Sequence, residues 1–331
     1  MSFKHYQFLL VIVTAFVLVA GTVSPAAALD EIKVHTSGST SANVLIYKIA
    51  QEKGFYRDEN LNVLTIAATS QAGIQGLVGG SFDFSQILGQ TSAAILHGAP
   101  LKNVMVFDTK PLFWFFGSKK IKRLEDLKGG KLIGVSSLGA NTDQMTREVL
   151  AMNGIDPRKD VVIQGTGTGP IRLAALVGGS LDAAITNPTE SIMARKQGLN
   201  ELFFYGDYDL NVVSGGVALT DRMLKEKPDL VRRFLRATVR SLFWFRANEK
   251  EAVARMAEGF KISRDDALGI YKATLKSYTT DGTISRELQD KIVTFQKKQL
   301  KIEKDIGPEQ VYDFTVLRAA IADVKKAGQD R

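Results

Sequence analysis

The sequence contains no cysteine and only three histidines, and these shortages exclude several kinds of site. Without cysteine there is no disulfide framework, no thiolate metal site, no cysteine nucleophile and no lipid-bearing N-terminal cysteine. Beyond the first 28 residues only His35 and His97 remain, and neither belongs to a cluster with metal-ligand spacing. No Ser-His-Asp arrangement can be built from them. We therefore expect no catalytic residues, no metal site and no cofactor.

Nucleotide-binding motifs are also missing. The glycine-rich run at residues 165–169 does not have G-x-G-x-x-G spacing, and no phosphate-loop lysine occurs. A basic run at residues 119–123 is a short loop, which we interpret as solvated rather than as a nucleic-acid site.

Long hydrophobic runs are scarce, and the clearest one covers residues 8–20. It follows the positive start at Lys4 and precedes a small-residue stretch in which Ala26 and Ala28 occupy the positions read by signal peptidase. We predict a signal peptide at residues 1–28, cleavage after Ala28 and export to the periplasm. An uncleaved anchor is the alternative, but the run is shorter than the roughly 20 residues that span a bilayer.

The net charge is a weak guide to the ligand. Loss of the predicted signal peptide removes Lys4 and no acidic residue, so the 43 lysines and arginines fall to 42 against 35 acidic residues. A net charge of +7 fits an anionic ligand or an acidic partner. It fits equally well a basic protein with neither, because net charge bears on steering and solubility and not on fold.

An internal repeat is the most informative feature of the chain. LVGGSFD at residues 77–83 recurs as LVGGSLD at residues 176–182, with six of seven positions identical. Ser37 and Gly54 recur as Ser137 and Gly154, so the match is co-linear over some 60 residues. Each glycine ends an amphipathic stretch, as a left-handed helix cap does. This pattern indicates a duplicated structural unit.

Both copies predict the same order of elements. Strands are expected at residues 31–35, 61–67 and 82–88 in the first copy, and at 131–135, 160–164 and 181–186 in the second. Helices fill the gaps between them, and short connections of this kind imply parallel strands with right-handed crossovers. The prediction is an α/β protein of two lobes, each a mostly parallel sheet flanked by helices.

The C-terminal third changes character and predicts helices alone. These are expected at residues 229–246, 249–258, 264–277, 285–300 and 308–326, packed on the first lobe. The arginines at 232, 236 and 240 share one face of the first helix, which we interpret as solvated. The chain would cross between lobes near residues 112–117 and 212–217, which gives a first lobe of residues 29–112 and 216–331 and a second lobe of residues 113–215.

Small polar residues follow the strands of both copies, where ligands bind in open parallel α/β sheets. Several of these loops begin helices, whose free N–H groups and dipoles attract anions. Alternatively, each residue merely caps a helix or forms a turn. The predicted ligand-binding residues are Ser37, Ser39, Thr40, Ser70, Gln90, Thr91, Ser137, Asn141, Thr142, Thr166 and Asn187. No lysine or arginine lies in these loops, which favours a monoanion or a neutral solute over a dianion.

Three motifs in sequence order resemble the nitrate/sulfonate/taurine-type solute-binding proteins. They are IAQEKGFY at residues 49–56 before LNV at 61–63, LEDLKGGK at 124–131, and KPDLVRRFLRA at 227–237. The resemblance covers roughly residues 31–327. It implies a type II periplasmic-binding-protein fold that closes on a small molecule and delivers it to the permease subunits of an ABC transporter. The family binds nitrate, alkanesulfonates, bicarbonate, pyrimidines and aromatic acids, so it leaves the ligand open.

Two alternatives accompany this reading. The superfamily includes thiamine-pyrimidine synthases, which are cytosolic iron-dependent enzymes with a cysteine-rich motif, and this chain has no cysteine. The other alternative is a ligand-sensing domain that docks on a membrane receptor. For the binding protein we expect a monomer.

Overall fold

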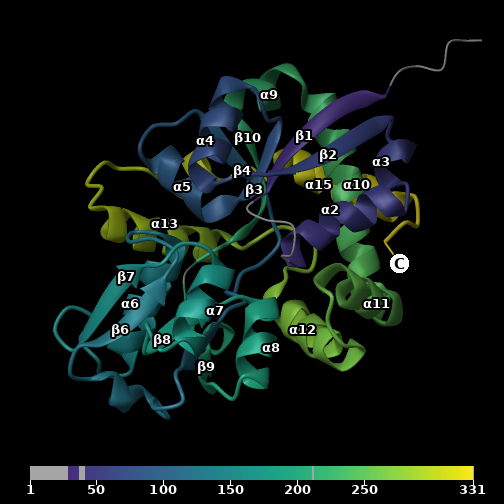
Figure 1. Cartoon of the computed structure of the whole chain (residues 1–331). Helices are drawn as coiled ribbons and strands as arrows, with labels where there is room; N and C mark the ends of the chain where they lie inside the picture. The colour runs from purple at the N-terminus through teal and green to yellow at the C-terminus, as the bar shows by residue number, and fades with distance from the viewer. Residues whose placement is uncertain (1–28, 37–41, 211, 331) are drawn as a thin grey trace, which may run out of the picture.

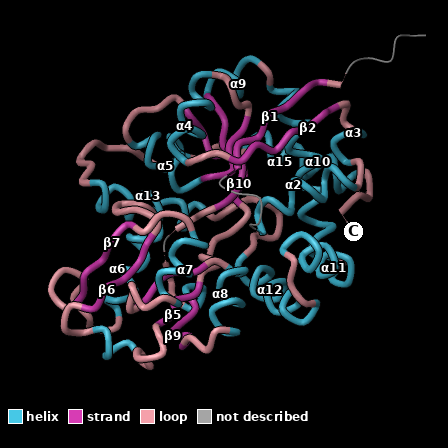
Figure 2. Tube along the Cα trace, in the orientation of Figure 1, coloured by secondary structure: helices cyan, strands magenta, loops and turns pink. Residues whose placement is uncertain are grey.

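The computed structural model describes residues 29–36, 42–210 and 212–330, which fold into two α/β lobes (Figure 1). Each lobe contains one five-stranded sheet with helices packed around it (Figure 2). We call lobe I the sheet of β1 to β4 and β10 with its helices, and lobe II the sheet of β5 to β9 with its helices. The predicted fold class, two lobes each with a mostly parallel sheet, is confirmed.

The sheet of lobe I has the strand order β2-β1-β3-β10-β4. β1 is parallel to β2 and β3, whereas β10 is antiparallel to both of its neighbours. The strands are β1 (Asp30–Thr36), β2 (Leu61–Ala67), β3 (Phe84–Ile87), β4 (Leu101–Val106) and β10 (Gly215–Thr220). Because β10 follows lobe II in the chain, the polypeptide crosses between the lobes twice.

The sheet of lobe II repeats this plan with the order β7-β6-β8-β5-β9. β6 is parallel to β7 and β8, and β5 is antiparallel to β8 and β9. The strands are β5 (Trp114–Gly117), β6 (Lys131–Val135), β7 (Val161–Gly165), β8 (Ala183–Thr186) and β9 (Asn200–Phe204). Residues 114–117 therefore belong to a buried strand rather than to a crossing, which lies between β4 and β5.

Helices connect the strands at the places that the repeat predicts. Lobe I contains α2 (Ala42–Glu52), α3 (Phe55–Asp58), α4 (Ser70–Gly79) and α5 (Leu88–Leu96). Lobe II contains α6 (Asn141–Met152), α7 (Gly169–Val177) and α8 (Pro188–Lys196), with short 3₁₀ turns at Leu124–Leu127 and Tyr205–Asp207.

The repeated LVGGS(F/L)D motif has the same structural role in both lobes. Leu77 and Leu176 are buried in the cores of their lobes. Asp83 Oδ2 accepts the backbone N–H of Lys33 at 2.8 Å, and Asp182 Oδ2 accepts that of Leu132 at 2.9 Å. Each carboxylate thereby joins the start of the third strand of its unit to the first strand.

The C-terminal helices pack mainly on lobe I. They are α9 (Asp221–Glu226), α10 (Pro228–Ala247), α11 (Glu249–Phe260), α12 (Arg264–Ser277), α13 (Arg286–Leu300), α14 (Pro308–Val311) and α15 (Thr315–Lys326). Phe234 of α10 stacks on Phe84 of β3 with ring centroids 4.0 Å apart, inside the core of lobe I. Lobe II is contacted as well, since Ala273 of α12 and Phe295 of α13 pack against its cores.

Two expectations for this region need correction. The single helix expected at residues 308–326 is two helices, because Tyr312 forms a β-bridge with Asn103 and interrupts the helical path. The arginine face of α10 is not simply solvated. Arg236 pairs with buried Glu59 and with Asp323, and Arg240 pairs with Asp58, because acidic residues from α3 and α15 meet this face.

Candidate functional site

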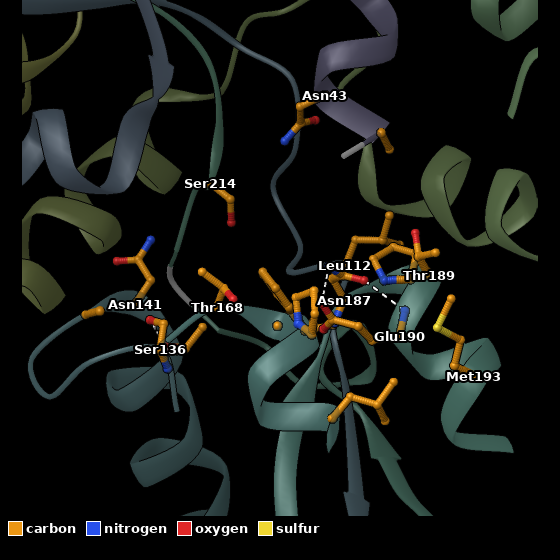
Figure 3. A pocket seen from close by; sticks show the side chains of 18 of the residues that line it. Asn43, Leu112, Ser136, Asn141, Thr168, Asn187, Thr189, Glu190, Met193 and Ser214 are labelled. Carbon is orange, nitrogen blue, oxygen red and sulfur yellow. Dashed lines mark hydrogen bonds between the residues drawn. The ribbon is translucent and has the colours of Figure 1, made fainter. Parts of the chain in front are cut away.

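A cavity of about 960 Å³ lies between the two lobes and is lined from both. Figure 3 shows Asn43 of α2 on one side, facing Ser136, Asn141 and Asn187 of lobe II across the space. The connections between the lobes supply Asp108, Leu112, Phe113 and Ser214 to its wall. The cavity therefore adjoins both segments that join the lobes, where the carboxyl ends of the parallel strands converge.

The cavity wall is largely apolar, with polar groups at a few positions. Apolar contacts come from residues of both lobes and of the connections: Ile87, Leu112, Phe113, Pro170, Leu173, Val177 and Met193. Among the described residues, the side chains with carboxyl or amino groups that line the cavity are Asp108, Glu190 and Lys196. An apolar cavity with a few fixed polar groups is typical of sites for small organic molecules.

Five of the predicted ligand-binding residues line this cavity: Ser70, Gln90, Asn141, Thr142 and Asn187. Thr142 and Asn187 are already engaged within lobe II. The hydroxyl oxygen of Thr142 accepts the N–H of Ser136 at 3.0 Å. Asn187 forms a reciprocal capping box with Glu190 at the start of α8. Both residues thus shape the wall through hydrogen bonds inside the protein.

Three other predicted residues lie away from the cavity lining. Thr91 is fully buried and its hydroxyl donates to Asn103 at 2.7 Å, inside lobe I. Thr166 contacts the carbonyl of Gln164, and Ser137 follows β6 without reaching the wall. Ser37, Ser39 and Thr40 lie outside the described residues.

Asn141 brings the two lobes into contact at one edge of the cavity. A Cβ added at Gly89 of α5 would lie 2.1 Å from Asn141 Nδ2 of α6. The absence of a side chain at Gly89 is what allows this approach. On the other side, Lys196 of α8 pairs with Asp266 of α12 at 3.1 Å.

Asp108 is a buried carboxyl that the sequence analysis missed. It lies just after β4 and accepts the backbone N–H groups of Ser214 and Gly215, at 2.8 and 3.1 Å, at the start of β10. It also accepts Asn43 Nδ2 at 2.7 Å, and the Tyr278 hydroxyl donates to Asn43 Oδ1 at 2.7 Å. Burial raises the pKa of Asp108 to about 6, and the hydrogen bonds oppose that shift. The carboxyl therefore joins the outgoing and returning connections.

Glu190 is the second buried carboxyl of the wall. It is 4% exposed, and its two oxygens accept the backbone N–H and the side-chain amide of Asn187 at 3.0 and 2.9 Å (Figure 3). A Cβ on Gly169, the first residue of α7, would lie 1.6 Å from Glu190 Oε1. One carboxyl group therefore lies at the starts of both α7 and α8. Burial raises its pKa, and Asn187 and nearby Arg172 oppose the rise.

Gln86 is a third residue that the sequence analysis missed. It lies near the carboxyl end of β3, is 3% exposed and lines the cavity. Its Oε1 atom is buried without a hydrogen-bond partner among the described residues. At the repeat spacing of 99 residues the second copy has buried Ile185, so Gln86 is polar where the matching residue of the other copy is apolar.

His35 is not among the residues that line the cavity. It is fully buried in lobe I and contacts the hydroxyl of Ser85 at 2.9 Å and the carbonyl of Ala68. Burial lowers its pKa. Among the residues that the structure describes, no three His, Asp or Glu side chains gather in a way that could hold a metal ion. None of the described helices is long and apolar enough to cross a membrane.

Comparison with solved structures defines the class of fold. The nitrate-binding protein NrtA of Synechocystis PCC 6803 matches with a TM-score of 0.72 at 16% identity, over 92% of this chain and 91% of that one. A ligand-binding component of an ABC-type import system from Staphylococcus aureus, solved with zinc bound, matches with a TM-score of 0.72 at 17% identity, over 88% and 99%. The chain thus has the two-lobed periplasmic-binding-protein fold.

The family follows from a sequence comparison. Residues 41–252 match the model of the NMT1/THI5-like family, and the chain belongs to that family. This confirms the resemblance that the motifs indicated.

Among curated proteins, the riboflavin-binding protein RibY of Chloroflexus aurantiacus is 26% identical over 219 residues, 62% of this chain. The match spans only 60% of that relative's own length. The fold also occurs in an enzyme: a structure named as the desulfurization enzyme DSZB matches with a TM-score of 0.68 at 13% identity, over 89% and 99% of the two chains. Fold alone therefore does not separate binding from catalysis.

Proposed function

We propose that this protein is the periplasmic solute-binding subunit of an ABC importer and that it holds a small organic solute between its two lobes. The observation that carries the proposal is the cavity of about 960 Å³ lined by both lobes and by the two connections. A solute in this space would touch both lobes at once, so its binding energy would favour the closed arrangement.

The described wall offers few groups for chemistry on the ligand. Its buried carboxyls, Asp108 and Glu190, are each held by hydrogen bonds from the protein, and no histidine lines the cavity among the described residues. A general acid–base pair needs groups that can reach the substrate and exchange protons with it. This composition supports binding without conversion.

The size and polarity of the cavity favour an organic solute over a small inorganic ion. Cavities of roughly 300–1,000 Å³ enclose molecules with several rings or a long chain. The name of the riboflavin-binding relative makes flavins and related heteroaromatic compounds the first candidates to test. Delivery would be to permease subunits, and the predicted cleavage after Ala28 would release the mature protein into the periplasm.

The test is a thermal-shift and calorimetric screen of residues 29–331 with flavins, pyrimidines, aromatic acids, sulfonates and nitrate. A true ligand should stabilise by about 2.7 kcal/mol at a hundredfold excess over Kd. Mass spectrometry of the recovered ligand should return it unchanged. A chemically altered product would favour the synthase-like alternative and contradict the proposal.

A further inference from the structure

Gln86 lines the cavity and has an oxygen atom that is unpaired within the described part of the chain, which bears on the chemistry of the ligand. Its amide lies on the central strand β3, and its Oε1 atom is buried with no partner among the described residues. Buried acceptors are nearly always paired, and an unpaired one that lines a ligand cavity is a candidate contact for the ligand. An oxygen acceptor can be satisfied only by an N–H or O–H group.

Lobe II opposes a negatively charged ligand for an independent reason. The starts of α7 and α8 would ordinarily attract an anion, but the carboxyl group of Glu190 already lies at both. At the start of α6, Asp143 accepts the backbone N–H of Gly139 at 2.8 Å and pairs with Arg147, although it does not itself line the cavity. The protein's own carboxyl groups therefore occupy the helix starts of lobe II.

The other charged groups in or near the wall do not make it favourable for a negatively charged ligand. Asp108 adds a second buried carboxyl, while the ammonium group of Lys196 is largely exposed and pairs with Asp266. Arg172 is buried nearby, but its guanidinium donates to the carbonyls of Ile185 and Gly167 and it does not line the cavity.

We propose that the solute is a neutral or cationic organic molecule with N–H or O–H donors, and that Gln86 and Glu190 select it against deprotonated oxyanions. This inference rests on the proposed function and narrows its ligand class. Nitrate and sulfonates carry no donor, so they would leave the Gln86 oxygen unpaired and would place negative charge beside Glu190. Burial raises the pKa of Glu190, which is consistent with a wall that disfavours further negative charge.

The test is calorimetric titration at pH 7.5 with two matched sets of probes. Riboflavin, uracil and thiamine offer N–H donors and are neutral or cationic, whereas nitrate, methanesulfonate and benzoate are anions without donors. At least one probe of the first set should bind, at least tenfold more tightly than any of the second. Tighter binding of an oxyanion would overturn the inference and leave the proposed function intact. Binding of neither set would contradict both.

Variants of Gln86 test whether this residue contributes to the selectivity for the ligand. Gln86→Leu removes the unpaired oxygen, so the melting temperature of the free protein should stay equal or rise, while affinity for the bound probe falls roughly 5- to 100-fold. Gln289→Leu is the matched control, because Gln289 is a buried amide on α13 that donates to Ile284 and does not line the cavity. Unchanged affinity in Gln86→Leu, or an equal loss in the control, would overturn the role of Gln86.

Glu190→Gln tests the other wall. It should lower the preference for the donor-bearing probe over benzoate at least threefold, because one carboxylate charge is removed from the cavity. A circular dichroism melt checks that α8 still forms, since the change also weakens the capping box with Asn187. An unchanged preference in a folded variant would overturn the role of Glu190.

Discussion

The two lobes share a scaffold and differ in their walls. Val34 pairs with Phe84 in lobe I, and Ile133 pairs with Ala183 in lobe II, each at the repeat spacing of 99 residues. Asp83 and Asp182 make the same hydrogen bond in the two copies. The duplicated sequence thus preserves strand register and the contacts that hold it.

The first turns of the helices differ in acidic residues between the two lobes. In lobe I the first turns of α2, α4 and α5 contain no acidic residue, whereas in lobe II the first turn of α6 contains Asp143 and that of α8 contains Glu190. The position that matches Glu190 at the repeat spacing is Thr91, a buried residue bonded inside lobe I. A ligand held between the lobes, as we propose, would therefore meet two unlike surfaces.

The largest expected effect comes from the matched core leucines. Leu77→Ala and Leu176→Ala should each cost about 3 kcal/mol, because both side chains are buried in the cores of their lobes. Each lobe also has its own tryptophan, Trp114 on β5 and Trp244 on α10. In single-tryptophan backgrounds, urea unfolding should show Leu77→Ala moving mainly the Trp244 transition and Leu176→Ala mainly that of Trp114. Equal shifts of both transitions would mean that the lobes unfold as one unit.

The second prediction concerns the connection between the lobes. The pKa of Asp108 is about 6 in the folded protein against an ordinary value of 3.8, so the native state holds this proton more tightly than the unfolded chain. The free energy of unfolding should therefore fall as pH rises from 4 to 6, with about 3 kcal/mol from this group. Asp108→Asn should lose that part of the pH dependence, while exposed Asp305→Asn should keep it. Identical pH profiles for wild type and Asp108→Asn, from urea unfolding at pH 4 and 7, would refute this.

The smallest effect tests the equivalence of the repeats. Asp83→Ala and Asp182→Ala each remove one charged acceptor from a strand N–H, so each should cost about 1.5 kcal/mol of unfolding free energy. The two losses should agree within about 0.5 kcal/mol in urea unfolding if the motif does the same work in both lobes. A loss confined to one lobe would show that only one copy of the motif still matters.

The internal repeat was enough to predict the repeated strands of both lobes and the helices between them. The details of the site depend on contacts between residues far apart in the sequence, which a local pattern does not reveal. Strands β2 and β6 have their predicted bounds because apolar runs and flanking turns define them locally. The split at Tyr312 depends on its bridge to Asn103, more than 200 residues away. Likewise, Asp108 and Glu190 lie at helix starts and connections, where an acidic residue ordinarily indicates a cap or a turn. The burial of both carboxyl groups depends on residues that are distant in the sequence.

Hydrogen–deuterium exchange with and without a saturating concentration of the tightest-binding probe from the calorimetric titration tests whether both lobes form one binding site. We predict slower exchange at the same time in β3 and the start of α5 (residues 86–90) and in the first turns of α8 (residues 188–193). The edge strands β2 and β9 should be unaffected. Slower exchange in one lobe alone, or in neither lobe at saturation, would contradict a site shared between the two lobes.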